Sequence, residues 1–196
     1  MIVNSKKFWT LGGLGLALVT VIAMVGCLGG FAPMAPNTTD SVIEQMTPIL
    51  EPPNWLKYTL PQQPGAAKIV SAAKVVNLSS GGPVSVSSGS MTTTLQIPAQ
   101  STTGSVTISV ALDTPGNVVV NFDPEGIQFN PPATLTVAGV TDSDGGPVTN
   151  PTLCWFNPTD DQWYEINTTV TVVSTNSVAV PLKHFSRYGL RDNREK

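Results

Sequence analysis

The sequence predicts an all-β fold, with one antiparallel β-sandwich domain after an N-terminal apolar segment and a proline-rich stretch. From about residue 68 onward, apolar and polar residues alternate over short runs, which is the pattern of half-buried strands. Clusters of Gly, Pro, Asn and Asp separate these runs at 81–83, 113–117, 142–147 and 157–161, as expected of turns. No run in this region keeps a helical period over three turns.

The predicted strands follow one another at the spacing typical of a sandwich or barrel. The run 106–112 shows the pattern most clearly, because Val106, Ile108, Val110 and Leu112 fall on one face of an extended chain. The region of roughly 120 residues is large enough for a hydrophobic core of its own. The predicted strands are 84–86, 92–97, 106–112, 117–122, 133–137, 153–156, 162–166, 169–173, 177–182 and 187–190.

The N-terminal segment has the three parts of a secretory signal. A basic start with two lysines is followed by an uncharged apolar run over 11–25 and by a small residue, Gly26. Residues 24–27, Met-Val-Gly-Cys, resemble the lipobox of bacterial lipoprotein precursors, in which the cysteine is diacylated and becomes the mature N-terminus. The resemblance implies a signal peptide over 1–26 and a lipid on Cys27.

An uncleaved single-pass anchor is the alternative for this segment. Residues 8–31 form an uncharged stretch long enough to span the hydrocarbon core, although their glycines weaken a helix. Both alternatives place the remainder of the chain outside the cytoplasmic membrane, because the two lysines stay inside. In some bacteria, an aspartate directly after the lipidated cysteine favours retention of a lipoprotein at the inner membrane. This chain has Leu28 at that position, which favours the outer membrane or the cell surface for the form lipidated on Cys27.

Residues 27–67 form a lipidated, proline-rich tether in this interpretation. Prolines at seven positions interrupt regular structure and stiffen the chain. Only 39–46 has a helical pattern, which ends at a proline. The apolar residues there and at 55–60 either dock on the domain or extend freely with the tether. The sandwich is then predicted over 68–190, with a charged C-terminal tail over 191–196.

Composition excludes two classes of function. The chain has 10 Lys and Arg against 13 Asp and Glu, with no basic stripe, so it lacks the electrostatic attraction on which nucleic-acid binding depends. One histidine and two cysteines, without clustered acidic residues, are too few ligands for a catalytic zinc or iron site. No cofactor is predicted. The expected partners are the membrane, through the N-terminal lipid, and an unidentified envelope protein or glycan.

Three segments carry a resemblance to a known domain family. They are 95–99 followed by 106–108; 122–135, in which a Pro-Glu-Gly turn, a phenylalanine and a double proline precede a strand; and 184–188. In this order and spacing they resemble the ZU-type β-sandwich domain found in netrin receptors, ankyrins, tight-junction scaffolds and many bacterial envelope proteins. The resemblance covers about residues 80–190. It implies a sandwich fold with a role in protein interaction or scaffolding.

The middle segment of this resemblance has a structural explanation. Residues 124–126 suit a tight turn, and Phe129 is expected to point inward. Pro131 and Pro132 suit the start of the strand at 133–135 at a sheet edge, where a missing backbone donor is tolerated. All of these roles are structural, so the segment by itself does not predict a reaction.

The triplet His184-Phe185-Ser186 allows two interpretations. In some relatives of the ZU-type domain such a triplet cleaves itself, which would make Ser186 the nucleophile, His184 the proton-transfer residue, and the Phe185–Ser186 peptide the bond that breaks. That chemistry needs a strained peptide and a donor to the developing oxyanion. In the structural interpretation, which we favour, Phe185 and Tyr188 anchor the last strand and His184 hydrogen-bonds to a neighbouring loop.

Aromatic residues on the predicted strands 153–156 and 162–166 also have two possible roles. Large aromatic side chains usually fill cores, and they pair across neighbouring strands. If they face outward, they can stack on a sugar ring, so a carbohydrate-binding module is a further alternative function. The exposure of Trp155 and Trp163 distinguishes the two roles. The residues concerned are Trp155, Phe156, Trp163 and Tyr164.

Cysteine and acidic residues in the second half of the chain are predicted to be structural. A lipid on Cys27 leaves Cys154 without a disulfide partner, and we expect it to fill the core. Residues 142–145, Asp-Ser-Asp-Gly, resemble the start of a calcium loop, but Leu153 stands where the bidentate glutamate would be. A polar turn is therefore expected there. The acidic pair 160–161 is expected in a solvated turn, with a weak calcium site as the alternative.

Overall fold

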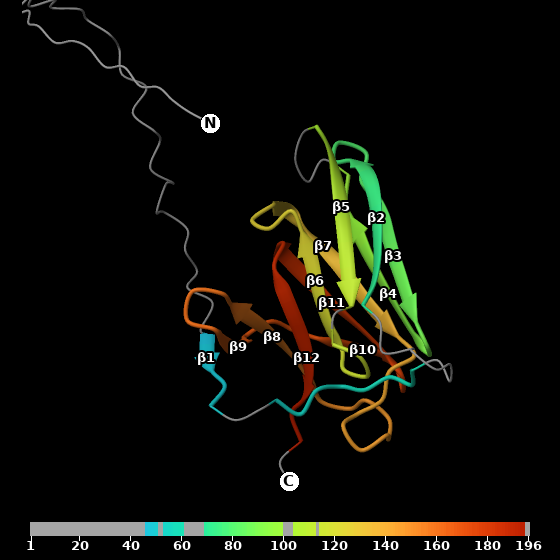
Figure 1. Cartoon of the computed structure of the whole chain (residues 1–196), viewed down its shortest axis with the longest axis vertical. Coiled ribbons are helices and arrows are strands. Elements are labelled where there is room, and N and C mark those ends of the chain that lie inside the picture. Colours follow the sequence, from blue (N-terminus) through green and yellow to red (C-terminus); the bar gives the residue numbers. More distant parts are fainter. Residues whose placement is uncertain (1–45, 51–52, 61–68, 100–103, 113, 195–196) are drawn as a thin grey trace, which may run out of the picture. The chain divides into compact units, whose positions relative to one another are not determined.

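A computed structural model describes residues 46–50, 53–60, 69–99, 104–112 and 114–194 of the chain. These residues form two antiparallel β-sheets that pack face to face, which confirms the predicted all-β sandwich (Figure 1). No helix long and apolar enough to cross a membrane occurs in these ranges. The predicted signal peptide and Cys27 lie outside the described residues.

The described residues form twelve strands in two sheets. In chain order they are β1 (Met46–Pro48), β2 (Val70–Asn77), β3 (Gly82–Ser88), β4 (Met91–Ile97), β5 (Ser105–Leu112), β6 (Val119–Asp123), β7 (Gln128–Ala138), β8 (Pro151–Asn157), β9 (Gln162–Ile166), β10 (Thr171–Ser174), β11 (Ser177–His184) and β12 (Arg187–Asp192). The larger sheet has the order β1-β9-β8-β12-β6-β5-β2, and the smaller has the order β10-β11-β7-β4-β3. The last strand, β12, therefore lies in the middle of the larger sheet.

Alternating burial along the strands explains why the sequence forms two packed layers. In β4, Met91, Thr93, Leu95 and Ile97 are buried, while the residues between them are exposed or half-buried. Successive side chains of a strand point to opposite faces, so such a strand covers the core with one face only. Residues of this kind from both sheets form one hydrophobic core. Each large apolar side chain buried there contributes about 1.5–3 kcal/mol.

Each predicted strand falls on an observed strand, although the ends differ. β2 was not predicted, because Val70–Asn77 lacks alternation and Val76 is its only buried residue. It pairs with β5 along its whole length. β7 begins earlier than predicted and contains Pro131 and Pro132, which lie beyond the part of β7 that pairs with β4 and at the shift in its register with β11. β7 lies between β11 and β4, so the sheet edge expected for these two prolines was wrong. They lie instead where the ladders of β7 are interrupted, and a missing backbone donor costs least at such a position.

The start of the described chain differs from the helix expected over 39–46. Met46 lies in β1, which pairs with β9 at the edge of the larger sheet, with Met46 opposite Ile166. Residues 39–45 lie outside the described residues. A helix of two turns is marginal in water, whereas the open edge of β9 offers backbone partners to an extended chain. The helical prediction was therefore wrong at Met46.

Residues 53–60, which we call the strap, cross one end of the sandwich (Figure 1). Leu56 is fully buried in the core, and its N–H donates to the carbonyl of Leu190 in β12 (2.8 Å). Further along the strap, Ser90 between β3 and β4 donates its N–H to the carbonyl of Thr59 (2.9 Å). The strap thus bonds to both sheets. The sequence left open whether residues 55–60 dock on the domain or extend freely with the tether, and in the structure they dock.

The C-terminal end of the sandwich also extends beyond the predicted range. Arg191 and Asp192, expected in a charged tail, belong to β12, and Asp192 is only 4% exposed. The Asp192 N–H donates to the carbonyl of Asn54 in the strap (2.8 Å). Because the strap covers this end, the charged residues there have partners that the sequence does not reveal. The described sandwich therefore reaches from β1 to the end of β12.

Candidate functional site

The triplet 184–186 lies where β11 ends and β12 begins. Phe185 is 1% exposed, and its ring stacks on that of Phe122 with centroids 5.4 Å apart and meets Phe129 edge-on at 4.8 Å. The Phe185 N–H donates a hydrogen bond to the carbonyl of Ile127 (2.8 Å). These contacts fix the backbone of the triplet against the segment between β6 and β7.

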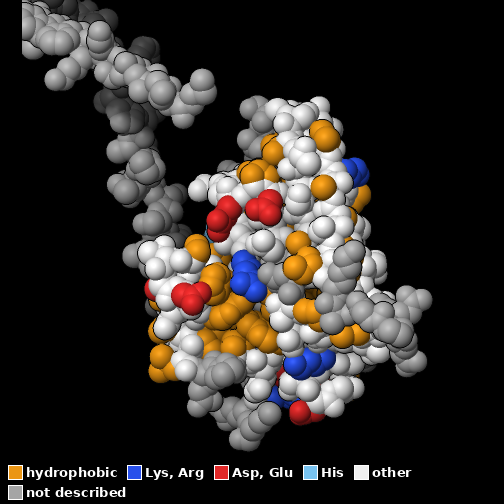
Figure 2. All heavy atoms as spheres, in the orientation of Figure 1, with side chains coloured by type: hydrophobic (Ala, Val, Ile, Leu, Met, Phe, Trp, Pro, Cys, Tyr) orange, Lys and Arg blue, Asp and Glu red, His pale blue; other side chains and the backbone are white. Residues whose placement is uncertain are grey.

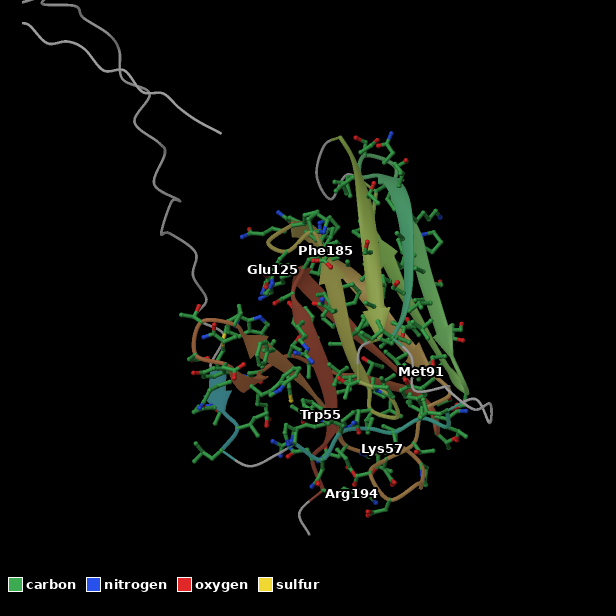
Figure 3. All side chains as sticks on the ribbon, viewed as in Figure 1. Trp55, Lys57, Met91, Glu125, Phe185 and Arg194 are labelled. Atoms are coloured by element: carbon green, nitrogen blue, oxygen red, sulfur yellow. The ribbon has the colours of Figure 1, made fainter. Side chains whose placement is uncertain are left out.

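Ser186 belongs to a polar network at the same place. Its hydroxyl donates to Oε1 of Glu125 (3.1 Å) and accepts from Nε1 of Trp155 (2.8 Å). Ser186 is 3% exposed, whereas Glu125 projects from an exposed turn. Figure 3 shows Glu125 and Phe185 near one another at one end of the sandwich. Two of the segments that carry the family resemblance are therefore joined by a side-chain hydrogen bond.

His184, at the end of β11, is half-buried and contacts β12. The Tyr188 hydroxyl donates to the His184 carbonyl (3.1 Å) and lies 3.1 Å from Nδ1 of the same residue. That nitrogen lies 3.4 Å from the carbonyl oxygen of Phe185. The sequence predicted a loop partner for His184, and the structure gives it Tyr188 in a neighbouring strand. His184 also lines an apolar cavity of about 80 Å³ between the sheets, together with Leu153 and Ile166.

Self-cleavage needs a base for the nucleophile, a donor to the oxyanion and a strained peptide, and the first two are present at the triplet. The Glu125 carboxylate accepts the Ser186 hydroxyl proton in a hydrogen bond, as a base for a nucleophile would. The Gly126 N–H donates to the Phe185 carbonyl oxygen (3.2 Å), as an oxyanion donor would. The third requirement is a strained peptide. In the described part of the chain Asp161 is the only non-glycine residue with a left-handed φ, so neither Phe185 nor Ser186 has the backbone strain of that region.

The four aromatic residues of β8 and β9 divide between the two faces of the larger sheet. Trp155 lies opposite Tyr164 in the ladder, and Phe156 lies opposite Trp163. Trp155 packs against the core. Because side chains alternate along a strand, Phe156 and Trp163 lie on the outer face, where both are half-buried. The exposure of Trp155 and Trp163 was expected to distinguish a core role from sugar stacking. Trp155 faces inward, as a core residue does, and Trp163 faces outward.

Trp55 of the strap joins Phe156 and Trp163 on the outer face. The ring of Trp55 meets that of Trp163 edge-on with centroids 4.7 Å apart, and Trp163 lies 5.3 Å from Phe156. The Arg187 guanidinium lies over Phe156 (5.2 Å) and over Trp163 (5.7 Å). Figure 2 shows hydrophobic side chains gathered around a basic side chain on this face. We call Trp55, Phe156, Trp163 and Arg187 the outer aromatic patch.

A hollow of about 390 Å³ adjoins the outer aromatic patch. Residues 48–50 line one side of it, and Glu165 and Arg191 line the other. The Ile49 N–H donates to the carbonyl of Trp163 (2.9 Å), which links the hollow to the patch. Oε2 of Glu165 lies 3.6 Å from Nη1 of Arg191, so this wall presents an ion pair. Nε of Arg191 is buried and has no hydrogen-bond partner among the described residues.

The acidic loop at 142–146 is held by its own backbone and by Arg194. Oδ1 of Asp142 accepts hydrogen bonds from two backbone N–H groups of the loop, at 2.7 and 2.9 Å. Arg194 lies 2.9 Å from the Asp142 carboxylate and 2.6 Å from that of Asp192. The cation between these buried carboxylates is thus a guanidinium of the chain itself, in agreement with the polar turn that was predicted. The described residues contain no group of three or more His, Cys, Asp or Glu placed to hold a metal ion.

The acidic turn at 160–161 holds its hydrogen bonds locally. The Tyr164 hydroxyl donates to Oδ2 of Asp160 (2.6 Å), and the Gln162 N–H donates to Oδ1 (3.2 Å). The hydrogen bond to Asp160 raises the pKa of Tyr164. Glu165, the next acidic residue along the chain, contacts Arg191.

Cys154 is buried, as predicted, but on the outer face of the larger sheet. It lies opposite Gly189 in the ladder with β12, and the Trp55 ring packs on Gly189. Burial raises the pKa of the Cys154 thiol to about 12. A thiol with such a pKa is almost entirely protonated at neutral pH and is a poor nucleophile. This favours a structural role for Cys154.

Comparison with family models, curated proteins and solved structures found no match for this chain. The resemblance to the ZU-type domain therefore stays a prediction that rests on three segments of the sequence. The sites above are described from their own geometry alone.

Proposed function

We propose that this chain is a lipid-anchored protein of the bacterial cell envelope that displays its β-sandwich, facing away from the cytoplasm, as a non-enzymatic binding or scaffolding module. The sequence pattern that ends at Cys27 supports the lipid anchor, and Leu28 supports the outer membrane or the cell surface. The binding role is carried by the outer aromatic patch, because half-exposed aromatic and arginine side chains gathered on one face are typical of interaction surfaces.

The pairing of β1 with β9 limits the length of chain that can separate the sandwich from a lipid on Cys27. Only residues 28–45, which number 45 − 27 = 18, lie between Cys27 and the first residue of β1. Even fully extended, a segment of this length spans no more than about 65 Å. A lipid on Cys27 would therefore tether the sandwich within that distance of the membrane.

Labelling with radioactive palmitate tests the anchor. Expressed in a bacterial host, the full chain should incorporate the label and fractionate with membranes, and Cys27→Ser should abolish both. Protease added to intact cells expressing an outward-facing form should remove the sandwich without lysis. Palmitate incorporation that persists in Cys27→Ser, or an unlabelled chain recovered with cytoplasmic proteins, would refute the proposal.

Self-cleavage at the Phe185–Ser186 bond is a second candidate function, favoured by the hydrogen bonds at the triplet. The resemblance implies His184 as the proton-transfer residue, but the His184 ring lies against Tyr188, and the hydroxyl of Ser186 donates to Glu125. Glu125 would therefore take the Ser186 hydroxyl proton as Oγ attacks the Phe185 carbonyl carbon, and the Gly126 N–H would donate to its oxygen. The C–N bond then breaks, the proton goes to the leaving amine, and water hydrolyses the resulting ester. This leaves a carboxylate on Phe185 and a new N-terminus at Ser186. The burial of Ser186 opposes the last step, since it restricts the access of water.

Denaturing mass spectrometry of the purified chain tests this second candidate. Denaturation is essential, because β12 pairs with β6 and β8 on its two sides and would hold a cleaved fragment in place. A fragment that begins at Ser186, absent in Ser186→Ala and slowed in Glu125→Gln, would establish the reaction. An intact chain after prolonged incubation would reject it.

A further inference from the structure

The outer aromatic patch is a preorganised surface. Trp55 packs on Gly189 so closely that a Cβ at position 189 would collide with its ring. Trp163 is held between Trp55 on one side and Phe156 on the other, with Arg187 over its ring. Side chains fixed in this way lose little conformational entropy when they bind, so a flat ligand can bind them at low entropic cost.

A pair of oppositely charged side chains stands in the hollow beside these rings. In the adjoining hollow the Glu165 carboxylate faces the Arg191 guanidinium at 3.6 Å. Together they offer planar acceptors and donors without net charge. The Arg191 and Glu165 side chains both line the hollow, so their terminal atoms can donate to and accept from a group that enters it. Arg187 already stacks on two rings of the patch.

We infer that the outer aromatic patch and its hollow bind a neutral glycan chain. The apolar C–H face of a sugar ring stacks on an aromatic ring, while its neighbouring hydroxyls can both donate to Glu165 and accept from Arg191. A charged ligand would leave one of the paired side chains facing a like charge, which costs binding energy. A purely apolar partner would remove water from the charged Glu165 and Arg191 side chains without replacing its hydrogen bonds, which costs binding energy. The surface therefore matches an uncharged polyhydroxy ligand best.

This inference rests on the proposed binding role of the sandwich and supplies its ligand class. The two can fail separately. Loss of palmitate labelling with glycan binding retained would remove the lipid anchor and leave the site, whereas labelled protein that binds no glycan would remove the site and leave the anchor.

Isothermal titration of the full chain in detergent with four neutral hexasaccharides tests the inference. The probes are the β-1,4-linked hexamers of glucose, mannose and N-acetylglucosamine and the β-1,3-linked hexamer of glucose. At least one should bind with a measurable Kd, accompanied by a change in tryptophan emission. If none of the four binds at millimolar concentration, the inference is wrong.

Variants then assign the site. Trp163→Ala should weaken binding about tenfold or more, the equivalent of one aromatic contact. Glu165→Gln, which leaves the rings untouched, should also weaken it, and this variant keeps the test valid if Trp163→Ala does not fold. Tyr164→Phe is the matched control, because Tyr164 follows Trp163 on the same strand but faces the other way. Equal affinity in all three variants would place the sugar elsewhere and overturn the inference. Loss of binding to an envelope protein, with no effect on any sugar, would identify a protein site and overturn it too.

Discussion

The indole ring of Trp55 packs on the α-carbon of Gly189 in the middle of the larger sheet. Gly189 lies between Val119 in β6 and Cys154 in β8, and all three positions face outward. Val119 is nevertheless 1% exposed and Cys154 0% exposed. Neither belongs to the core cluster between the sheets. The strap therefore creates a small second core on the outer face, with Trp55 as its cover.

Gly189→Ala should destabilise the sandwich by about 1–3 kcal/mol, the usual cost of overpacking. The φ of Gly189 is not in the left-handed region, so the cost is steric, and the atoms nearest to an added Cβ belong to the Trp55 ring. Chemical denaturation measures it. In a Trp55→Leu background, where the smaller side chain leaves room, the same substitution should cost less. An equal cost in both backgrounds would mean that Trp55 is not the obstacle.

Trp55→Ala should make Cys154 reactive towards a thiol reagent. In the native chain at pH 8 the thiol is covered and its raised pKa of about 12 keeps it protonated, so labelling should wait for unfolding. Opening the cover admits water, lowers the pKa and speeds labelling without denaturant. The measurement is the rate of alkylation followed by mass. Rapid labelling of the native chain at pH 8 would contradict this account.

Ser186→Ala should destabilise the fold by about 1–3 kcal/mol, because it leaves the Nε1–H of the half-buried Trp155 without its acceptor. Trp155→Phe removes the donor as well. In a double-mutant cycle the two substitutions together should cost less than the sum of the single ones. Additive costs, measured by denaturant unfolding, would show that the 2.8 Å hydrogen bond contributes little.

Arg194→Gln should make the protein more sensitive to acid. Burial alone raises the pKa of Asp192, but the hydrogen bonds and charge of Arg194 outweigh it and lower the pKa below its ordinary value of 3.8. A carboxyl with a lowered pKa in the folded state stabilises the protein above its unfolded pKa, and this contribution is lost as pH falls through the folded pKa. Without Arg194 the loss begins at higher pH. The midpoint of acid unfolding should therefore rise, whereas Lys74→Gln, which removes a surface charge elsewhere, should leave it unchanged.

The sandwich could be predicted from the sequence because its signal is local. Alternation within a strand such as 106–112 reports which face is buried, and turn residues mark the ends. β1 and β2 were not predicted, because they lack such a local signal. Val70–Asn77 has one buried residue, and Met46–Pro48 has none, so neither carries an alternating pattern. Both strands are held by backbone hydrogen bonds to a neighbouring strand, and such bonds do not depend on the side chains that a sequence pattern reports.

The candidate sites were predictable only in part, because they join residues distant in sequence. The triplet 184–186 was visible as a motif, but its contact with Glu125 depends on the packing of two turns. Trp163 was visible as an aromatic residue, yet its face became known only through the ladder with β8. Trp55 stood in a proline-rich stretch and was assigned to the tether. Its apolar neighbours were the one signal that the stretch docks.

The boundary of the folded unit can be tested by truncation. A chain that begins at residue 46 keeps β1 and the strap, whereas one that begins at residue 68, the predicted start of the sandwich, loses both. The shorter chain loses Leu56, which is fully buried, and uncovers the outer face at Gly189. Removal of one such leucine side chain alone costs about 2–5 kcal/mol, a large part of the stability of a domain.

The chain from residue 46 should therefore unfold cooperatively, with a melting temperature near that of the full chain. The chain from residue 68 should melt much lower or aggregate. A synthetic peptide of residues 53–60 added to it should restore part of the lost stability, because the hydrogen-bond partners at Leu190 and Ser90 remain in place to receive it. Equal melting temperatures for the two truncated chains would show that the strap is dispensable and that the sandwich folds from β2 onward.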